Sequence, residues 1–292
     1  MPITNQPVRQ VASVYHRKIG DVTVTAVSDG GMQLPFWPYY ELDEEKGKAI
    51  LDANFEIMPP LLNTNCFLIN VEGRLTLIDA GIGMGFGQVL QNIKEAGYTI
   101  EDIETVLLTH LHPDHSNGLI HTNGTKAFPK AEIVVNNIEY GYWMDNSNMK
   151  DPSDENEKGN FQMAQAALAP YKGRIRTFTT GENEPVPGIQ AIEAPGHTPG
   201  HTAFLIKSNG DRLLIWGDIL HNASIQLLRP DEKLAMDVFP EIAVKTRKRI
   251  LDFAADEQLL ISGMHLSFPG FGYIRKEQDH YVHVPEYWNS KL

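Results

Sequence analysis

Apolar and polar residues alternate along several short stretches of the chain, which is the pattern of half-buried β-strands. Residues 22–27 show it first and run into Asp29-Gly30-Gly31, where we predict a turn because glycine adopts positive φ without strain. Residues 66–71 and 75–78 repeat it on either side of Gly73 and predict a hairpin. The chain is therefore expected to open with antiparallel strands.

Strand and helix patterns follow one another through the rest of the chain. Apolar runs predict strands over residues 103–108, 131–135, 188–193, 202–206, 212–216 and 258–262. Helical spacing or composition predicts helices over residues 43–54, 89–96 and 161–168, through Tyr140 and Trp143, and over 242–255. The polar run 146–160 is expected to be an exposed loop.

The stretch Thr109-His110-Leu111-His112-Pro113-Asp114-His115 comes directly after a predicted strand. In an extended segment, residues two apart face the same side, so His110, His112 and Asp114 are expected to converge while His115 points elsewhere. Pro113 strengthens this interpretation because it disfavours helical geometry at His112. Three imidazoles and a carboxylate so close together predict a site for divalent metal ions.

His197, Asp218 and His265 follow other predicted strands and supply the remaining ligands that two metals need. We expect His110, His112 and His197 on the first metal, and Asp114, His115 and His265 on the second. Asp218 would place one carboxylate oxygen on each. Metals paired in this way lie ~3.5 to 4 Å apart and leave room for a bridging hydroxide. An isolated histidine is more often solvated or hydrogen-bonded, but the complete set argues against that interpretation.

The composition of the chain limits the classes of molecule that it is expected to bind. With 292 residues and a formal net charge of -12, the chain lacks the basic surface that nucleic-acid binding requires, which favours a small neutral substrate. The first residues lack a secretory signal, and no apolar run is long enough to span a membrane, so we expect a cytoplasmic protein unless a leader was removed. Cys66 is the only cysteine, which excludes an intramolecular disulfide and a cysteine cluster, and we expect a buried, inert thiol.

The pattern formed by Asp79, His110-x-His112-x-Asp114-His115, His197, Asp218 and His265 resembles the metallo-β-lactamase superfamily. The resemblance covers the whole chain in order and implies an α/β fold: one domain over residues 1–292, an αββα sandwich of two mixed sheets flanked by helices. It also implies that Asp79 holds the histidine loop from behind. From the residues alone, Asp79 is equally a turn carboxylate.

Within that superfamily, residues 217–226 and 264–272 look like those of methyl parathion hydrolase and the neighbouring N-acyl homoserine lactonases. This resemblance implies a dimeric hydrolase of lactones and aryl esters, with phosphotriester hydrolysis as a promiscuous activity. An N-acyl homoserine lactonase is the alternative. A thioester hydrolase is a weaker alternative, since such enzymes add a helical domain. A mononuclear iron enzyme of sulfur transfer or dioxygenation is also weaker, because Asp218, His115 and His265 favour two metals.

The expected mechanism uses two divalent metals, with Zn first and Mn, Co or Fe also suited to nitrogen and oxygen ligands. A metal-bridging hydroxide attacks, Asp218 bridges, and Asp114 passes a proton to the leaving group. His221 either hydrogen-bonds the substrate or lines the pocket, and His201 is expected to support a ligand.

By matching position, the aromatic residues Phe86, Trp143 and Phe161 either form a leaving-group pocket or belong to the core. The run Phe36-Trp37-Pro38-Tyr39-Tyr40 is interpreted as packing, with a substrate rim or a dimer contact as alternatives.

Overall fold

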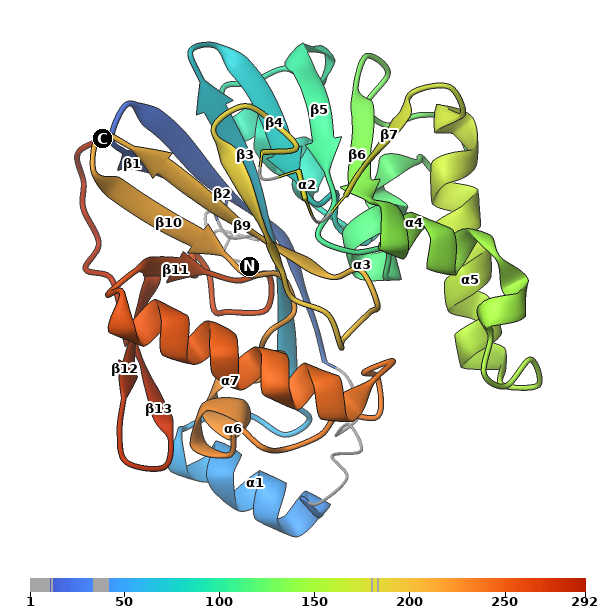
Figure 1. Ribbon diagram of the computed structural model, residues 1–292. Helices are drawn as coiled ribbons and strands as arrows, with labels where there is room; N and C mark the ends of the chain where they lie inside the picture. Colours follow the sequence, from blue (N-terminus) through green and yellow to red (C-terminus); the bar gives the residue numbers. More distant parts are fainter. Residues whose placement is uncertain (1–10, 12, 34–41, 180, 183) are drawn as a thin grey trace, which may run out of the picture.

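Two β-sheets face each other with helices on their outer sides in the computed structural model (Figure 1). The structure describes residues 11, 13–33, 42–179, 181–182 and 184–292. The aromatic run 36–40 lies outside the described residues. The αββα arrangement of two mixed sheets is confirmed.

The first sheet contains seven strands in chain order, antiparallel from β1 to β4 and parallel from β4 to β7. Its strands are β1 (Val14–Ile19), β2 (Val22–Gln33), β3 (Leu61–Val71), β4 (Arg74–Ile78), β5 (Ile103–Leu107), β6 (Glu132–Asn136) and β7 (Ile175–Phe178). The hairpin predicted around Gly73 is formed by β3 and β4.

The second sheet contains six strands in the order β13-β12-β11-β10-β9-β8, and only β10 and β11 pair in parallel. Its strands are β8 (Ile189–Glu193), β9 (Thr202–Ser208), β10 (Asp211–Ile215), β11 (Leu260–Ser262), β12 (Gly272–Lys276) and β13 (Tyr281–Pro285). The sequence patterns predicted β8 to β11 but not β12 and β13, which form the edge of this sheet.

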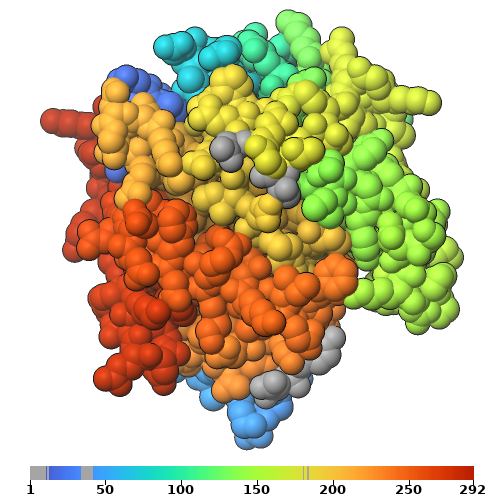
Figure 2. Space-filling view, viewed as in Figure 1, coloured from blue at the N-terminus to red at the C-terminus, as the bar shows by residue number. Residues whose placement is uncertain are grey.

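Seven α-helices lie in the described part of the chain. They are α1 (Glu44–Ala53), α2 (Val89–Glu95), α3 (Pro113–Ser116), α4 (Asn137–Met144), α5 (Glu155–Leu168), α6 (Ala223–Leu228) and α7 (Pro240–Asp256). Figure 1 shows α4 and α5 beside the end of the first sheet, and Figure 2 shows the residues of α7, in orange, on the outer surface. None of the described helices is long and apolar enough to cross a membrane.

The layers follow from strand alternation, because successive side chains leave a strand on opposite faces. On β3, Phe67 packs between the two sheets and Leu68 packs under the helices of the first sheet. On β10, Leu213 faces the first sheet and Leu214 faces α7. Strands apolar on both faces are thus covered on both faces, which leaves the strand ends as the place for polar chemistry.

Two local predictions were wrong. Asp29-Gly30-Gly31 is not a turn, because β2 continues to Gln33 with a bulge between Ser28 and Gly30. At the bulge, the Asp29 carboxylate accepts hydrogen bonds from the backbone amides of Gln88 and Val89 at the start of α2 and of Ile82 in the loop after β4. The loop expected over residues 146–160 ends early, because Asp154 caps α5 and the helix begins at Glu155.

Candidate metal centre

The histidine loop leaves the carboxyl end of β5 and changes conformation at Pro113. His112 is extended, with φ -63° and ψ 155°, whereas Pro113 begins the short helix α3. Proline is well suited to the first helical position because its φ is already helical and its missing N–H needs no partner. The prediction of an extended segment was therefore right up to His112 and wrong beyond it.

The turn of helix brings His115 back toward the histidines before it. Its ring centroid lies 4.0 Å from that of His110, and its Nε2 lies 3.2 Å from Asp218 Oδ1. The prediction that His115 points elsewhere was wrong, and helical geometry at Asp114 and His115 is the reason.

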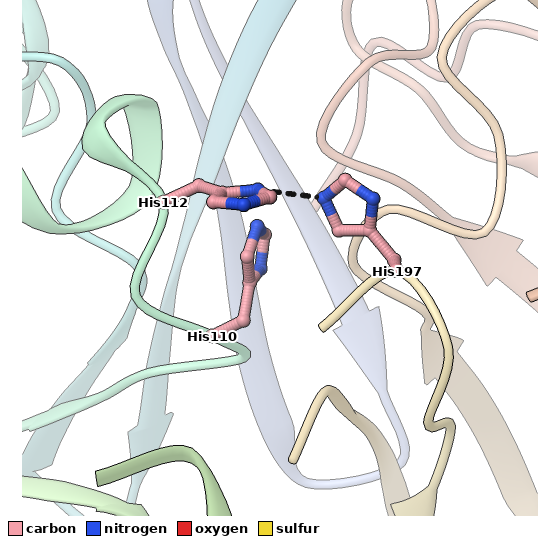
Figure 3. A group of neighbouring side chains, drawn as sticks. All are labelled: His110, His112 and His197. Atoms are coloured by element: carbon pink, nitrogen blue, oxygen red, sulfur yellow. Dashed lines mark hydrogen bonds between the residues drawn. The ribbon is translucent and has the colours of Figure 1, made fainter. Parts of the chain in front are cut away.

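Three histidines form a first donor group at this edge of the sheets (Figure 3). His110 and His112 come from the loop after β5, and His197 comes from the turn before β9. His112 Nδ1 and His197 Nε2 lie 2.8 Å apart, and the ring centroid of His110 lies 4.8 Å from each of the other two. Their donor atoms thus surround one point, as the ligands of a metal do.

A second donor group consists of Asp114, His115, Asp218 and His265. His265 Nε2 lies 3.0 Å from Asp218 Oδ2 and 3.5 Å from Asp114 Oδ2. Asp218 follows β10 and His265 follows β11, so the second sheet supplies half of this group. The same Asp218 Oδ2 lies 3.3 Å from His197 Nε2 in the first group, which places this carboxylate between the two groups.

The outward ring nitrogens of these histidines are bound to acceptors. His115 Nδ1 lies 2.7 Å from Asp79 Oδ2, His197 Nδ1 lies 2.9 Å from Asp237 Oδ1, and His265 Nδ1 lies 2.7 Å from the carbonyl oxygen of Asn63. Such acceptors hold the proton on Nδ1 and leave the Nε2 lone pair directed into the centre.

Asp79 supports the histidine loop from beneath. It lies just after β4 with φ 58°, and its side chain is completely buried. Oδ1 accepts a hydrogen bond of 2.8 Å from the Thr109 backbone N–H, and Oδ2 accepts one of 2.7 Å from the Thr109 hydroxyl. Thr109 Oγ1 in turn lies 3.0 Å from His110 Nδ1, so one carboxylate orients both His110 and His115.

The histidines of the centre differ in the direction in which their pKa values are shifted. Burial, with help from neighbouring imidazoles, lowers the pKa of His110 and His112 well below the usual value. Burial also opposes charge on His115, but the carboxylates of Asp218, Asp114 and Asp79 outweigh it and raise its pKa well above the usual value. For His197 the same competition, won by Asp218 and Asp237, raises the pKa to about 9. The carboxylates of the centre thus favour positive charge at His115 and His197, whereas His110 and His112 favour the neutral form.

Several polar atoms at the centre lack hydrogen-bond partners among the described residues. His110 Nε2, His115 Nε2 and Asp218 Oδ1 are buried and make no hydrogen bond, although the last two lie 3.2 Å apart as an ion pair. A buried polar atom left without a partner costs about 1–3 kcal/mol, so three at one place indicate that something else binds there. Imidazole and carboxylate donors suit divalent ions such as Zn, and the two groups fit two ions.

His201 and His221 lie next to Asp218. His201 Nδ1 lies 2.9 Å from the carbonyl oxygen of Ala194, and its Nε2 accepts a hydrogen bond of 3.0 Å from the Asp218 backbone N–H. Burial lowers the pKa of His201 to about 3, which keeps Nε2 an acceptor. His221 Nε2 lies 3.2 Å from Asp218 Oδ2, and its ring is stacked on that of His265 with centroids 5.1 Å apart.

The three aromatic residues expected at a leaving-group pocket are separated by exposure. Phe86 lies in the turn after β4 with 76% of its surface exposed. Phe161 is completely buried and packs on Trp143, with centroids 4.7 Å apart. Trp143 packs edge-on against His112 at 5.4 Å. Phe161 is therefore core, and of the two buried rings Trp143 is the one that contacts a histidine of the first group.

Two buried carboxylates at this centre were not anticipated from the sequence. Glu139, on α4, accepts hydrogen bonds from both loops that carry the first donor group, and Asp237 lies behind His197. Glu139 looks like one of the polar residues of an amphipathic helix, and Asp237 stands in a loop with no recognisable motif. The only local signal for Glu139 was its position in the first turn of α4, after the cap residue Asn136.

Known proteins match this chain in sequence. Residues 59–265 match the family model described as the metallo-beta-lactamase superfamily. The uncharacterized protein YobT of Bacillus subtilis (strain 168) is 30% identical over 169 residues, which are 55% of this chain and 63% of that protein. An N-acyl homoserine lactonase of Bacillus sp is 30% identical over 61% of this chain and 60% of its own length. The chain thus matches less than two thirds of these two relatives.

Longer alignments and solved structures agree with the family match. N-acyl homoserine lactonase AiiA of Bacillus thuringiensis subsp. kurstaki is 26% identical over 79% of this chain and 80% of its own. The crystal structure of hydrolase AbOPH in the beta lactamase superfamily has a TM-score of 0.91 and 32% identity, covering 97% of this chain and 100% of that one. AidC, a dizinc quorum-quenching lactonase, has a TM-score of 0.88 at 24% identity, covering 96% and 99%, and shows the fold.

The family match spans both donor groups, from before Asp79 to His265. The length of the family match, the two-sheet fold and the two groups of histidines and aspartates all indicate the same family. The chain therefore belongs to the metallo-beta-lactamase superfamily.

Proposed function

We propose that the protein is a dinuclear metal-dependent hydrolase of lactones that also cleaves aryl esters and, as a promiscuous activity, phosphotriesters. The observation that carries the proposal is the position of Asp218, within 3.0 Å of His265 Nε2 in one donor group and 3.3 Å of His197 Nε2 in the other. A buried carboxylate between two donor groups is what a pair of adjacent metal ions needs.

Lactones come first in this proposal because of the relatives. Several relatives named N-acyl homoserine lactonase align over about four fifths of this chain, 79%. An N-acyl homoserine lactone is accordingly the first substrate to test. Aryl esters and phosphotriesters follow from the sequence resemblance and from the shared chemistry of attack by water at a polarised carbonyl or phosphoryl group.

In this proposal His110, His112 and His197 would hold one ion and Asp114, His115 and His265 would hold the other, with Asp218 available to both. Two divalent ions bound there would lower the pKa of a bound water to about 7 and polarise the substrate oxygen. Zn is the proposed metal, since the donors are imidazoles and carboxylates in small groups.

The protein's own groups then handle substrate and proton. Asp114 keeps 20% of its side chain exposed, whereas Asp218 keeps 2%, so Asp114 is the carboxylate of the second group that faces the open side. From there it can take up the proton released by the attacking water and pass it to a leaving alkoxide. His221, beside Asp218 and stacked on His265, can donate a hydrogen bond to the substrate carbonyl or to the leaving oxygen.

A substrate panel on metal-loaded protein tests the proposal. It contains an N-acyl homoserine lactone, a simple aromatic lactone, an aryl acetate, a methyl phosphotriester and a glutathione thioester. We expect the lactones to have the highest kcat/KM, the thioester the lowest, and each chain to hold two metal ions by elemental analysis.

Asp218→Ala and chelator-treated protein serve as controls. Both are expected to lose turnover of every substrate, since the carboxylate that joins the two ions, or the ions themselves, would be gone. Unchanged turnover in Asp218→Ala would overturn the two-metal mechanism. One iron per chain together with oxidation of a thiol substrate would favour a redox enzyme instead.

A homodimer also belongs to this proposal. Sedimentation of the metal-loaded protein at micromolar concentration measures the assembly state directly, and a mass of one chain would contradict it.

A further inference from the structure

Glu139 is a completely buried carboxylate on α4 that reaches the loops of the first donor group. It accepts four hydrogen bonds, two on each oxygen. Oε1 accepts from the Leu111 backbone N–H at 2.9 Å and from Trp143 Nε1 at 2.6 Å. Oε2 accepts from the Thr198 hydroxyl at 2.7 Å and from the Gly200 backbone N–H at 2.9 Å.

These partners belong to two loops that are far apart in sequence. Leu111 stands between His110 and His112, and Thr198 directly follows His197. One carboxylate is thus bonded beside all three donors of the first group, while its four hydrogen-bond partners include no neighbour of Asp218 or His265. The distance between the two loops is set through this side chain.

The surrounding contacts hold Glu139 in this position. Trp143, which donates to Oε1, packs its ring against the edge of His112. A Cβ on Gly200 would collide with the backbone of Glu139, so glycine at this position lets the His197 turn lie directly on α4. The glutamate is enclosed on both sides by groups that are themselves tied to the first donor group.

We propose that Glu139 is a positioning residue for the first metal ion, fixing the His110-x-His112 loop against the His197 turn. The inference rests on the proposed dinuclear function and deepens it, because it assigns this carboxylate to one ion and not to the other. Four donors occupy both oxygens, so an amide of the same size leaves its NH2 group facing at least one N–H or O–H donor. Glu139→Gln therefore disturbs the loop spacing without emptying the space.

The test measures metal affinity. Wild type and Glu139→Gln are loaded with Zn²⁺ and titrated with a competing chelator, and the ions left on each chain are counted by elemental analysis. His112→Ala and His265→Ala identify which release step belongs to the first group and which to the second. We expect Glu139→Gln to bind the first ion about 10–100-fold more weakly, the usual effect of losing a hydrogen-bonded support of a ligand, and the second ion as wild type does.

Asp29→Asn is the matched control. Asp29 is also a buried carboxylate, and it accepts backbone hydrogen bonds from Ile82, Gln88 and Val89, none of which is a candidate ligand. We expect this variant to lower the thermal midpoint and to keep both ions. Thr198→Val, which removes one of the four bonds to Glu139, is expected to weaken the first ion in the same direction by a smaller factor.

The outcomes separate the two proposals. A wild-type chain that holds fewer than two ions contradicts the proposed function. A wild type with two ions and a Glu139→Gln variant with unchanged affinities overturns the inference alone. The inference is also overturned if Glu139→Gln binds both ions equally more weakly. It is overturned too if Asp29→Asn loses as much affinity for the first ion as Glu139→Gln does, since either result would reflect general destabilisation.

Discussion

His197 Nδ1 and Asp237 Oδ1 lie 2.9 Å apart, although 40 residues separate them in the chain. Asp237 is buried just before α7, and its Oδ2 lies 3.8 Å from Nη2 of Arg247 on that helix. Arg247 donates in turn to the carbonyl oxygens of Ile219, Pro230 and Glu232. The His197 imidazole is thereby anchored, through Asp237 and Arg247, to α7 on the outer side of the second sheet.

Removing the hydrogen-bond acceptor of His197 Nδ1 should weaken binding of the first metal ion. For Asp237→Ala we expect about 10–100-fold lower affinity for that ion, because nothing then holds the proton on Nδ1 and the ring in place. Asp237→Asn keeps an oxygen that accepts the same hydrogen bond and should retain most of the affinity. Chelator competition measures both. An Asn variant as weak as the Ala variant would contradict the role of the hydrogen bond.

Asp114 should matter most for substrates whose leaving group needs a proton. A lactone releases an alkoxide, whereas a nitrophenyl phosphotriester releases a stable phenolate, and general acid catalysis contributes about 10²–10⁴-fold where it is needed. In an Asp114→Asn protein that still holds both ions, kcat/KM should fall much further for the lactone. Equal losses on the two substrates would refute the proton transfer.

His221→Phe separates the two interpretations of that side chain. The ring can still stack on His265, but the hydrogen bond to substrate is lost. One neutral hydrogen bond is worth about 0.5–1.5 kcal/mol, so we expect lactone kcat/KM to fall about 2- to 10-fold with both ions retained. Steady-state kinetics on the metal-loaded variant check this. Unchanged kinetics would leave His221 as a wall of the site.

Gly217 should tolerate no side chain. Its φ is +63°, and a Cβ there would collide with Nε2 of His201, the atom that accepts the Asp218 N–H. Gly217→Ala should therefore lower both the thermal midpoint and turnover. Gly210 has φ +89° with open space around it, so Gly210→Ala carries only the backbone strain of about 1–2 kcal/mol and should keep full turnover. Equal effects of the two substitutions on turnover would contradict the contact.

The sequence was most informative where local pattern and chemistry coincide. Apolar patterns predicted β2 to β6 and β8 to β11, while the arrangement in two sheets came from the superfamily resemblance. His110, His112, His197 and Asp218 stand just outside predicted strands, so their convergence could be anticipated. The loop conformation at His115 could not, because an extended and a helical continuation both agree with Pro113. That choice depends on Asp79 and Asp218, which come from other parts of the chain.

Long-range hydrogen bonds account for what was missed. The Asp29 carboxylate leaves β2 to reach the start of α2, and no neighbour of Asp29 in sequence reveals this. Glu139 and Asp237 are ordinary acidic residues until the fold surrounds them with donors. Burial of a carboxylate is a property of the assembled layers, so a linear pattern does not contain it.

The division of the donors between the two sheets bears on how the centre is assembled during synthesis. The first sheet brings His110, His112, Asp114 and His115, and the second brings His197, Asp218 and His265. The first group is complete once His197 has been made, whereas the second needs His265 and cannot be complete before nearly the whole described fold has left the ribosome. Completion of the second group is therefore a late step of synthesis, while the first group needs no residue beyond Asp218.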